Sequence, residues 1–147
     1  MPIKVLIIDD DPAMVDMLEV TLRSQGMETI SACDGEKGAR LALNENPHII
    51  LLDLIMPGKD GWDVCKTIRK FSSAPIAVLS ALSDPGIISS ALDAGADEYL
   101  VKPITSSMLI AQVKKLARRA NAEHNPIKML GHMSAAHDTQ PLRTRSA

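Results

Sequence analysis

Five short apolar segments alternate along the chain with longer segments in which apolar residues recur at helical spacing. The apolar segments are residues 3–8, 27–32, 48–53, 76–80 and 97–102. Most are rich in Ile, Val and Leu, which is typical of strands buried on both faces of a parallel sheet. The segment 27–32 is the weakest of these predictions, and we expect it at an edge of the sheet.

The segments between these strands carry helix start and stop signals. Aspartate before a periodic apolar segment is a typical N-cap, proline favours the first turn, and glycine or asparagine often ends a helix. The expected starts are Asp11-Pro12, Asp34, Asp60, Asp84-Pro85 and Thr105 or Ser106, and the expected ends are Gly26, Asn46, Arg69 and Gly95. Strands therefore alternate with helices along the whole pattern.

This alternation predicts an α/β fold in which right-handed crossovers place helices on both faces of a parallel sheet. Five strands fit a flavodoxin-like (βα)5 three-layer sandwich with strand order 2-1-3-4-5. The 147 residues, of which 46% are hydrophobic, suit one core. We expect a domain over residues 1–120. Residues 121–147 lose the periodicity and indicate a flexible tail or a linker truncated before an output domain.

Charge and hydropathy exclude several functional classes. The formal net charge of -2 gives no general attraction to nucleic acid or to anionic membranes, so we expect neither direct nucleic-acid binding nor membrane binding by this chain. Neither a membrane span nor a secretion signal is apparent, which favours the cytoplasm. Cys33 and Cys65 lack metal-site or redox spacing, and we interpret both as small core residues.

Three aspartates, Asp9, Asp10 and Asp11, stand together where the first strand ends. Like charges this close repel one another unless a cation, a hydrogen-bond donor or a helix end stabilises them. Asp11 precedes Pro12 and is well placed to cap the first helix. Asp9 and Asp10 have no such structural role, so they are candidates for a binding site.

Other polar residues end the neighbouring strands of the predicted sheet. Ligands of such sheets bind outside the carboxyl ends of the strands, where the strand order reverses between strands one and three. Asp53 ends the third strand, Ser80 the fourth and Lys102 the fifth. We therefore expect these three side chains to share one cleft with Asp9 and Asp10.

The segments that carry these residues resemble the receiver domain of response regulators in two-component signalling, including chemotaxis regulators. The matching segments are "LIIDDD", "HIILLDLIMPGKDGWDV", "IAVLSAL" and "ADEYLVKPIT", and the resemblance extends over residues 3 to about 119. It implies that Asp53 is the phosphoacceptor, Lys102 the phosphate-binding lysine, Ser80 the switch hydroxyl and Tyr99 the aromatic switch. Tyr99 also has a simpler interpretation as a core residue.

The resemblance further implies a Mg²⁺ ion held by Asp9, Asp10, Asp53 and the backbone carbonyl of Ile55. The residue types suit this ion, because Mg²⁺ prefers oxygen ligands and is usually bound by one or two carboxylates together with phosphate and water. A cation is also needed where a carboxylate attacks phosphorus beside other carboxylates. A cis peptide bond before Pro103 is implied as well.

By resemblance, the chain receives a phosphoryl group from a sensor histidine kinase or a phosphotransfer protein. It is then a signalling module that catalyses only its own phosphorylation and dephosphorylation, and it switches the surface of its fourth helix, fifth strand and fifth helix toward an output partner or a missing effector domain. A phosphorylation-dependent homodimer is also implied, although Gln112 stands where the related winged-helix regulators often have arginine. The basic residues of the last helix are otherwise expected to form a solvated face.

Two other functional classes remain open. A protein-interaction domain with the same fold could act without phosphorylation. A Mg²⁺-dependent phosphohydrolase with Asp53 as nucleophile is less favoured, because no second acid-base carboxylate follows Asp53 in the "DLIMPGKDG" segment. The mass of the protein after incubation with a small phosphodonor distinguishes the first class from the preferred one.

Overall fold

All five predicted strands form, and they pair in parallel in one sheet with the order β2-β1-β3-β4-β5. The computed structural model describes residues 2–123. The strands are β1 (Lys4–Ile8), β2 (Glu28–Ala32), β3 (Ile49–Leu52), β4 (Ile76–Ser80) and β5 (Glu98–Val101). The helices are α1 (Pro12–Arg23), α2 (Gly35–Glu45), α3 (Gly61–Arg69), α4 (Pro85–Asp93) and α5 (Ser106–Glu123). The predicted fold, strand order and edge position of 27–32 are confirmed.

Aspartate caps begin four of the five helices. Asp11, Asp34, Asp60 and Asp84 each accept a hydrogen bond from a main-chain N–H in the first turn of the following helix. The fifth helix is capped by Thr105, whose Oγ1 accepts a bond of 3.1 Å from the N–H of Met108. These side chains satisfy N–H groups that have no partner within the helix. The helix starts read from the sequence are therefore confirmed.

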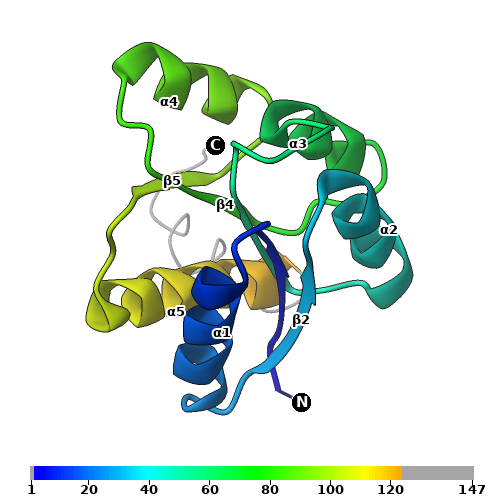
Figure 1. Cartoon of the computed structure of the whole chain (residues 1–147). Coiled ribbons are helices and arrows are strands. Elements are labelled where there is room, and N and C mark those ends of the chain that lie inside the picture. Colours follow the sequence, from blue (N-terminus) through cyan, green and yellow to red (C-terminus); the bar gives the residue numbers. More distant parts are fainter. Residues whose placement is uncertain (1, 124–147) are drawn as a thin grey trace, which may run out of the picture.

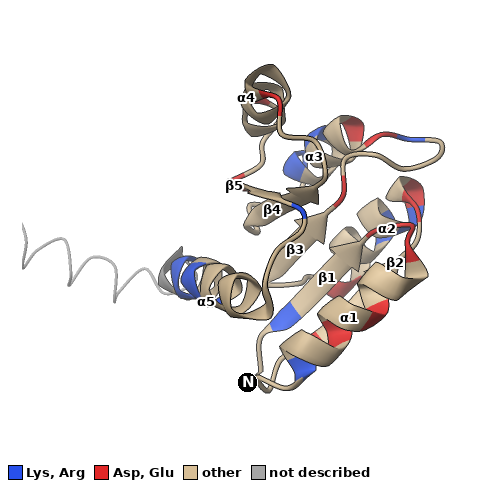
Figure 2. Ribbon diagram, turned by 60° about the vertical axis from the view of Figure 1, so that its left-hand side comes forward, with Lys and Arg blue, Asp and Glu red and all other residues tan. Residues whose placement is uncertain are grey.

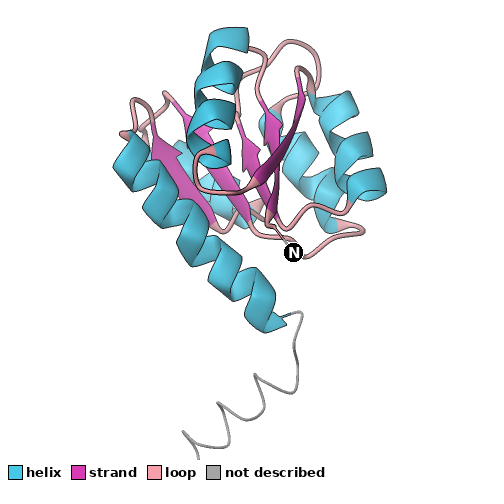
Figure 3. Cartoon of the chain, turned by 90° about the horizontal axis from the view of Figure 1, so that it is seen from below, coloured by secondary structure: helices cyan, strands magenta, loops and turns pink. Residues whose placement is uncertain are grey.

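Alternate residues of the strands form two separate cores, one on each face of the sheet. Helices cover both faces (Figure 1, Figure 3). On one face, residues such as Leu6 and Ile50 pack against α2, α3 and α4. On the other face, residues such as Val5 and Leu51 pack against α1 and α5. The central strands β1, β3 and β4 are covered on both faces, which fixes their ends and therefore the positions of the residues that follow them.

The last helix is longer than the sequence pattern indicates. It continues to Glu123, so its final residues belong to the segment predicted as a tail, and the rest of that segment lies outside the described residues. Within residues 2–123, none of the helices combines the length and the apolar character needed to cross a membrane.

The sequence predicted that the basic residues of α5 form a solvated face, but two of them make ion pairs instead. Lys115 pairs with Glu98, and Arg119 pairs with Asp97 at 2.9 Å, so two cations of α5 bind carboxylates of β5 and the residue before it. Figure 2 shows the basic character of α5 next to the mixed but mainly acidic α1. Neighbouring carboxylates therefore compensate two of the positive charges of α5.

The two cysteines differ in their surroundings. Cys65 lies in the core, as expected, and burial raises the pKa of its thiol to about 11. Cys33 is exposed, so its interpretation as a core residue is wrong. It follows the edge strand β2, where one face has less cover than in the central strands.

Candidate functional site

The predicted site residues meet at the carboxyl edge of the sheet. Asp9 and Asp53 directly follow β1 and β3, whose last residues are paired in register, and the N–H of Asp53 donates to Ile8 at 2.9 Å. Ser80 is the last residue of β4, and Lys102 follows β5. The N–H of Lys102 donates to the carbonyl of Ser80 at 2.8 Å. Pairing between neighbouring strands therefore aligns the main chains that carry these side chains.

Three carboxylates and one ammonium group converge in this cleft. Carboxylate oxygens of Asp9, Asp10 and Asp53 lie within 4.8 Å of one another. The Nζ of Lys102 lies 3.1 Å from Asp9 Oδ2 and 3.6 Å from Asp53 Oδ2. Asp9 is 3% exposed and Asp53 is 9% exposed, whereas Asp10 is more open to solvent. One lysine thus balances only part of the negative charge.

The ionised form of Asp53 is disfavoured in this cleft, which raises the pKa of its carboxyl group. Burial raises its pKa above the ordinary value of 3.8, and the neighbouring Asp9 and Asp10 raise it further. The N–H of Ile55, 3.2 Å from Asp53 Oδ1, and the ammonium of Lys102 act in the opposite direction. The net effect is a poorly solvated carboxylate that an added cation can stabilise.

The oxygen-rich donor set fits a hard divalent cation. Carboxylates are preferred ligands of Mg²⁺, and the close approach of three of them gives an ion several oxygen atoms in one place. The exposed position of Asp10 leaves this side of the cluster open to water. Asp11 stands outside this set, because its side chain caps α1 through the N–H of Ala13 at 3.1 Å, as predicted.

The main chain of Leu82 joins the two candidate switch residues. Its N–H donates to Ser80 Oγ at 3.2 Å, and its carbonyl accepts a hydrogen bond of 2.7 Å from the hydroxyl of Tyr99. Ser80 is fully buried and Tyr99 is half-buried against the core. The hydroxyls of Ser80 and Tyr99 are therefore joined through the main chain of one residue.

Sequence reasoning missed the roles of two main-chain groups. The N–H groups of Ile55 and Leu82 donate to the side chains of Asp53 and Ser80, and each donor lies two residues after its acceptor. Aspartate and serine often accept such bonds from the backbone two residues further on. That repeated spacing at two strand ends was the signal available in the sequence. The cis bond between Lys102 and Pro103, implied by resemblance, is present.

Comparisons with known proteins agree with this geometry. The model of the response regulator receiver domain family matches residues 5–114. The probable transcriptional regulator ycf27 of Porphyridium aerugineum is 41% identical over 118 residues, which are 80% of this chain and 49% of that protein. The DNA-binding response regulator MtrA of Mycolicibacterium smegmatis is 37% identical over 127 residues, 86% of this chain and 55% of that protein.

A solved structure has the same fold. A two-component response regulator from Clostridium difficile has a TM-score of 0.78 and 33% identity, covering 81% of this chain and 98% of that one. The chain spans about half the length of the two regulators above. From the family match, the shared fold and these relatives, the chain belongs to the response regulator receiver domains of two-component signalling.

Proposed function

We propose that Asp53 is the phosphoacceptor of this receiver domain and that its donor is a phosphohistidine of a sensor kinase or a phosphotransfer protein. The observation that carries the proposal is the position of Asp53, a buried carboxylate beside both Lys102 and the pair Asp9 and Asp10. Its raised pKa means that its negative charge is poorly stabilised before reaction. Asp9 shares the burial, the lysine and the neighbouring carboxylates, so the choice of Asp53 as nucleophile rests on its raised pKa and on the resemblance to receiver domains.

The proposed transfer uses one oxygen of Asp53 as the nucleophile. That oxygen forms a bond to phosphorus while the bond from phosphorus to the donor imidazole nitrogen breaks, and the electron pair of that bond remains on the imidazole. The product is an acyl phosphate on Asp53. Lys102 contacts Asp53 before the reaction and is close enough to neutralise the added phosphoryl oxygens afterwards.

The proposed metal ligands are Asp9, Asp10, Asp53 and the carbonyl of Ile55. Bound Mg²⁺ supplies positive charge to the carboxylates and phosphoryl oxygens, which lowers the repulsion that opposes attack. The chain's own residues set the rest of the geometry: β1 and β3 fix Asp9 and Asp53 side by side, and the N–H of Ile55 orients the Asp53 carboxylate.

The proposed switch joins Ser80 to Tyr99. A phosphoryl group on Asp53 adds strong hydrogen-bond acceptors, which attract the Ser80 hydroxyl away from the N–H of Leu82. The same residue holds the Tyr99 hydroxyl through its carbonyl, so the tyrosine responds to the change. The altered surface comprises α4, β5 and α5.

The length of the relatives supports an output partner outside the receiver. Both similar regulators are about twice as long as the matched region, and MtrA is described as DNA-binding. We propose that residues 1–120 form the receiver domain and that residues 121–147, the first three of which still belong to α5, lead into a tail or linker. We place the protein in the cytoplasm and assign DNA recognition, where it occurs, to a separate output domain or partner. A phosphorylation-dependent homodimer through the switched surface stays a prediction.

The test of the phosphoacceptor is intact mass after incubation with Mg²⁺ and a small phosphodonor such as acetyl phosphate. The parent should gain one phosphoryl group without a kinase, since the domain supplies its own catalytic groups. Asp53→Asn should gain none, and the matched control Asp63→Asn, which changes an exposed carboxylate on α3, should behave as the parent. Labelling of Asp53→Asn would refute the assignment. An unlabelled parent would favour the phosphorylation-independent interaction domain.

The metal proposal has a separate readout. At a Mg²⁺ concentration ten times its Kd, the parent should gain about 1.4 kcal/mol of stability, because the ion binds the folded state. Asp10→Ala should lose this gain, and Asp63→Ala should keep it. Thermal unfolding with and without Mg²⁺ measures both effects, and equal gains in the parent and Asp10→Ala would remove the metal assignment.

A further inference from the structure

Helix α4 has fewer buried residues than any other helix within residues 2–123. Only Ala91 is buried in α4, whereas α1 buries two leucines and α2 and α3 each bury four residues. Its sequence also contains Gly86, Ser89 and Ser90, which are poor or moderate helix formers. Few buried apolar contacts and low propensity identify a segment that opens more easily than the rest of the fold.

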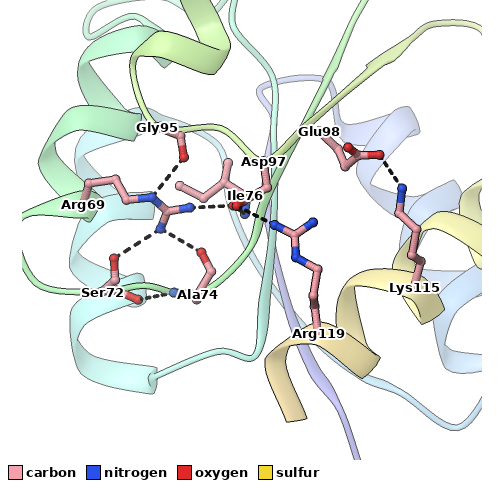
Figure 4. A network of polar contacts seen from close by, with 9 residues as sticks. All are labelled: Arg69, Ser72, Ala74, Ile76, Gly95, Asp97, Glu98, Lys115 and Arg119. Carbon is pink, nitrogen blue, oxygen red and sulfur yellow. Dashed lines mark hydrogen bonds and ion pairs between the residues drawn. The ribbon is translucent and has the colours of Figure 1, made fainter. Parts of the chain in front are cut away.

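The chain just after α4 is held firmly by Arg69, the last residue of α3 (Figure 4). Arg69 Nε donates to the carbonyl of Gly95 at 2.9 Å, and Arg69 Nη2 lies 2.7 Å from Asp97 Oδ2. The same guanidinium also reaches the carbonyls of Ser72 and Ala74 at 3.2 and 2.8 Å. This set of contacts, which we call the Arg69 clamp, joins the end of α4 to α3 and to the start of β4.

Gly95 is the residue that permits this close contact. Its φ is +121°, a conformation that side-chain-bearing residues rarely adopt, and a Cβ atom there would lie 2.7 Å from Arg69 Cγ. Asp97, which follows, also accepts from the N–H of Ile76 at 2.8 Å and from Arg119 at 2.9 Å. The segment that directly follows α4 is therefore bound to α3, β4 and α5.

Among residues 2–123, one side-chain hydrogen bond links the body of α4 to α3. Trp62 Nε1 donates to Ser90 Oγ at 2.8 Å, and Ser90 Oγ in turn donates to the carbonyl of Ile87 at 2.9 Å. Trp62 is itself well placed, because it is half-buried against the core and because the preceding Gly61 donates to Leu54 at 2.9 Å. We call the bond between Trp62 and Ser90 the latch.

We propose that α4 is a hinged helix, with the Arg69 clamp as its fixed pivot and the latch between Trp62 and Ser90 as the contact that limits its opening. The start of the helix is the end that swings, because Asp84, Pro85 and Gly86 are exposed. The chain is held before them, where the carbonyl of Leu82 accepts a hydrogen bond from the Tyr99 hydroxyl. This proposal goes beyond the phosphoryl chemistry and does not depend on it. It concerns an equilibrium of the unmodified protein.

The decisive experiment is residue-resolved amide hydrogen exchange, measured by NMR on the whole chain without phosphodonor and corrected for intrinsic rates. In the parent, the amide of Ile88 should exchange at least several-fold faster than those of Ala94 and Ala96, which lie at the pivot. Uniform exchange rates from Ile88 to Ala96 would overturn the pivot. Amides of Leu51 in β3 report whether global unfolding contributes.

Two serine variants separate the latch from helix propensity. Alanine is the better helix former, so Ser89→Ala and Ser90→Ala should both slow exchange if propensity alone governed α4. Ser89 is exposed and serves as the matched control. With the latch, Ser90→Ala should instead speed exchange of the Ile88 amide about threefold, because a hydrogen bond to an otherwise fixed partner is lost. Slower exchange in both variants would overturn the proposal.

The donor side of the latch is tested by Trp62→Phe, which keeps an aromatic ring and removes the N–H. It should speed exchange of the Ile88 amide by a similar factor, and the double variant Trp62→Phe with Ser90→Ala should be no faster than either single variant, since both remove the same bond. A double variant in which the two factors multiply would mean that the residues act independently, which contradicts the latch.

Discussion

The two edges of the sheet use the same kinds of charged residue in opposite ways. At the carboxyl edge, Asp9, Asp10 and Asp53 share the single ammonium of Lys102. At the opposite edge, Asp97 alone receives two guanidinium groups and the N–H of Ile76 (Figure 4). Negative charge is therefore in excess at the first edge and fully compensated at the second.

This difference indicates which edge is built for chemistry and which for stability. A carboxylate with every oxygen hydrogen-bonded to a cation or an N–H has little to gain from a ligand, and it holds its elements together. A buried carboxylate with an incomplete set of partners raises the energy of the free protein, and a ligand that supplies the missing charge binds there. The unbalanced carboxylates thus support the proposed binding site in a fold that many functions share.

The largest expected effect comes from breaking the compensated edge. Asp97→Asn should lower the free energy of unfolding by about 2 kcal/mol, because it leaves Arg69 and Arg119 without their charged acceptor, with some solvent screening of a partly exposed pair. Glu98→Gln, which breaks the more exposed pair with Lys115, should lose less than about 1 kcal/mol. Urea unfolding measures both. Equal losses would mean that Asp97 has no special structural role.

The next largest effect concerns Ile55 and Leu82, whose side chains lie near the carboxyl edge of the sheet. Ile55 is 56% exposed and Leu82 is half-buried, and both lie two residues beyond a site residue. Neither side chain can orient a water for in-line attack on phosphorylated Asp53, so Ile55→Asn combined with Leu82→Glu should accelerate dephosphorylation by about tenfold, or about 1.4 kcal/mol. Decay of the phosphorylated protein after donor removal measures this. Unchanged or slower decay would show that water access past these residues does not set the lifetime.

The smallest expected effect is a gain in stability, opposite in sign to the loss expected for Asp97→Asn. Asp53→Asn should stabilise the metal-free protein by about 1 kcal/mol at neutral pH, because it removes a poorly solvated charge while keeping an oxygen for the N–H of Ile55. The raised pKa of Asp53 gives the pH dependence: its destabilisation is present when the carboxylate is ionised and is lost as the pH falls through the raised pKa toward 3.8.

Unfolding with a chelator from neutral pH to about pH 4 measures the difference between parent and variant. The gain should shrink toward the acid end of this range. A variant that is less stable than the parent at neutral pH would mean that the ion pair with Lys102 outweighs the cost of burying Asp53. The carboxylates at both edges of the sheet would then stabilise the fold.

Much of this architecture is predictable from local signals. Continuous apolar runs identify the strands, aspartate caps locate four helix starts, and strand order brings Asp9, Asp53, Ser80 and Lys102 to one edge. These features depend on backbone conformation and on pairing rules that short stretches of sequence carry. The roles of those residues in phosphoryl transfer stay predictions until the labelling experiment is done.

The remaining features depend on contacts between distant segments. The partners Arg69 and Asp97 are 28 residues apart, as are Trp62 and Ser90, and no periodic pattern links them. Arg69 looked like an ordinary basic residue at a helix end, and the cations of α5 looked like a solvated face. The extension of α5 to Glu123 also gave no signal, because helix ends fray and a sequence pattern does not place them to the residue.

The link between Ser80 and Tyr99 runs through the main chain of residue 82, and this has a consequence for how such a protein can diversify. Any amino acid except proline offers the same N–H and C=O groups at that position. If the proposed roles hold, substitutions of Leu82 would change the lifetime of the phosphorylated state and leave the connection between Ser80 and Tyr99 intact. Lifetime would then depend on the side chain of residue 82 and transmission on its main chain, so each could change without the other.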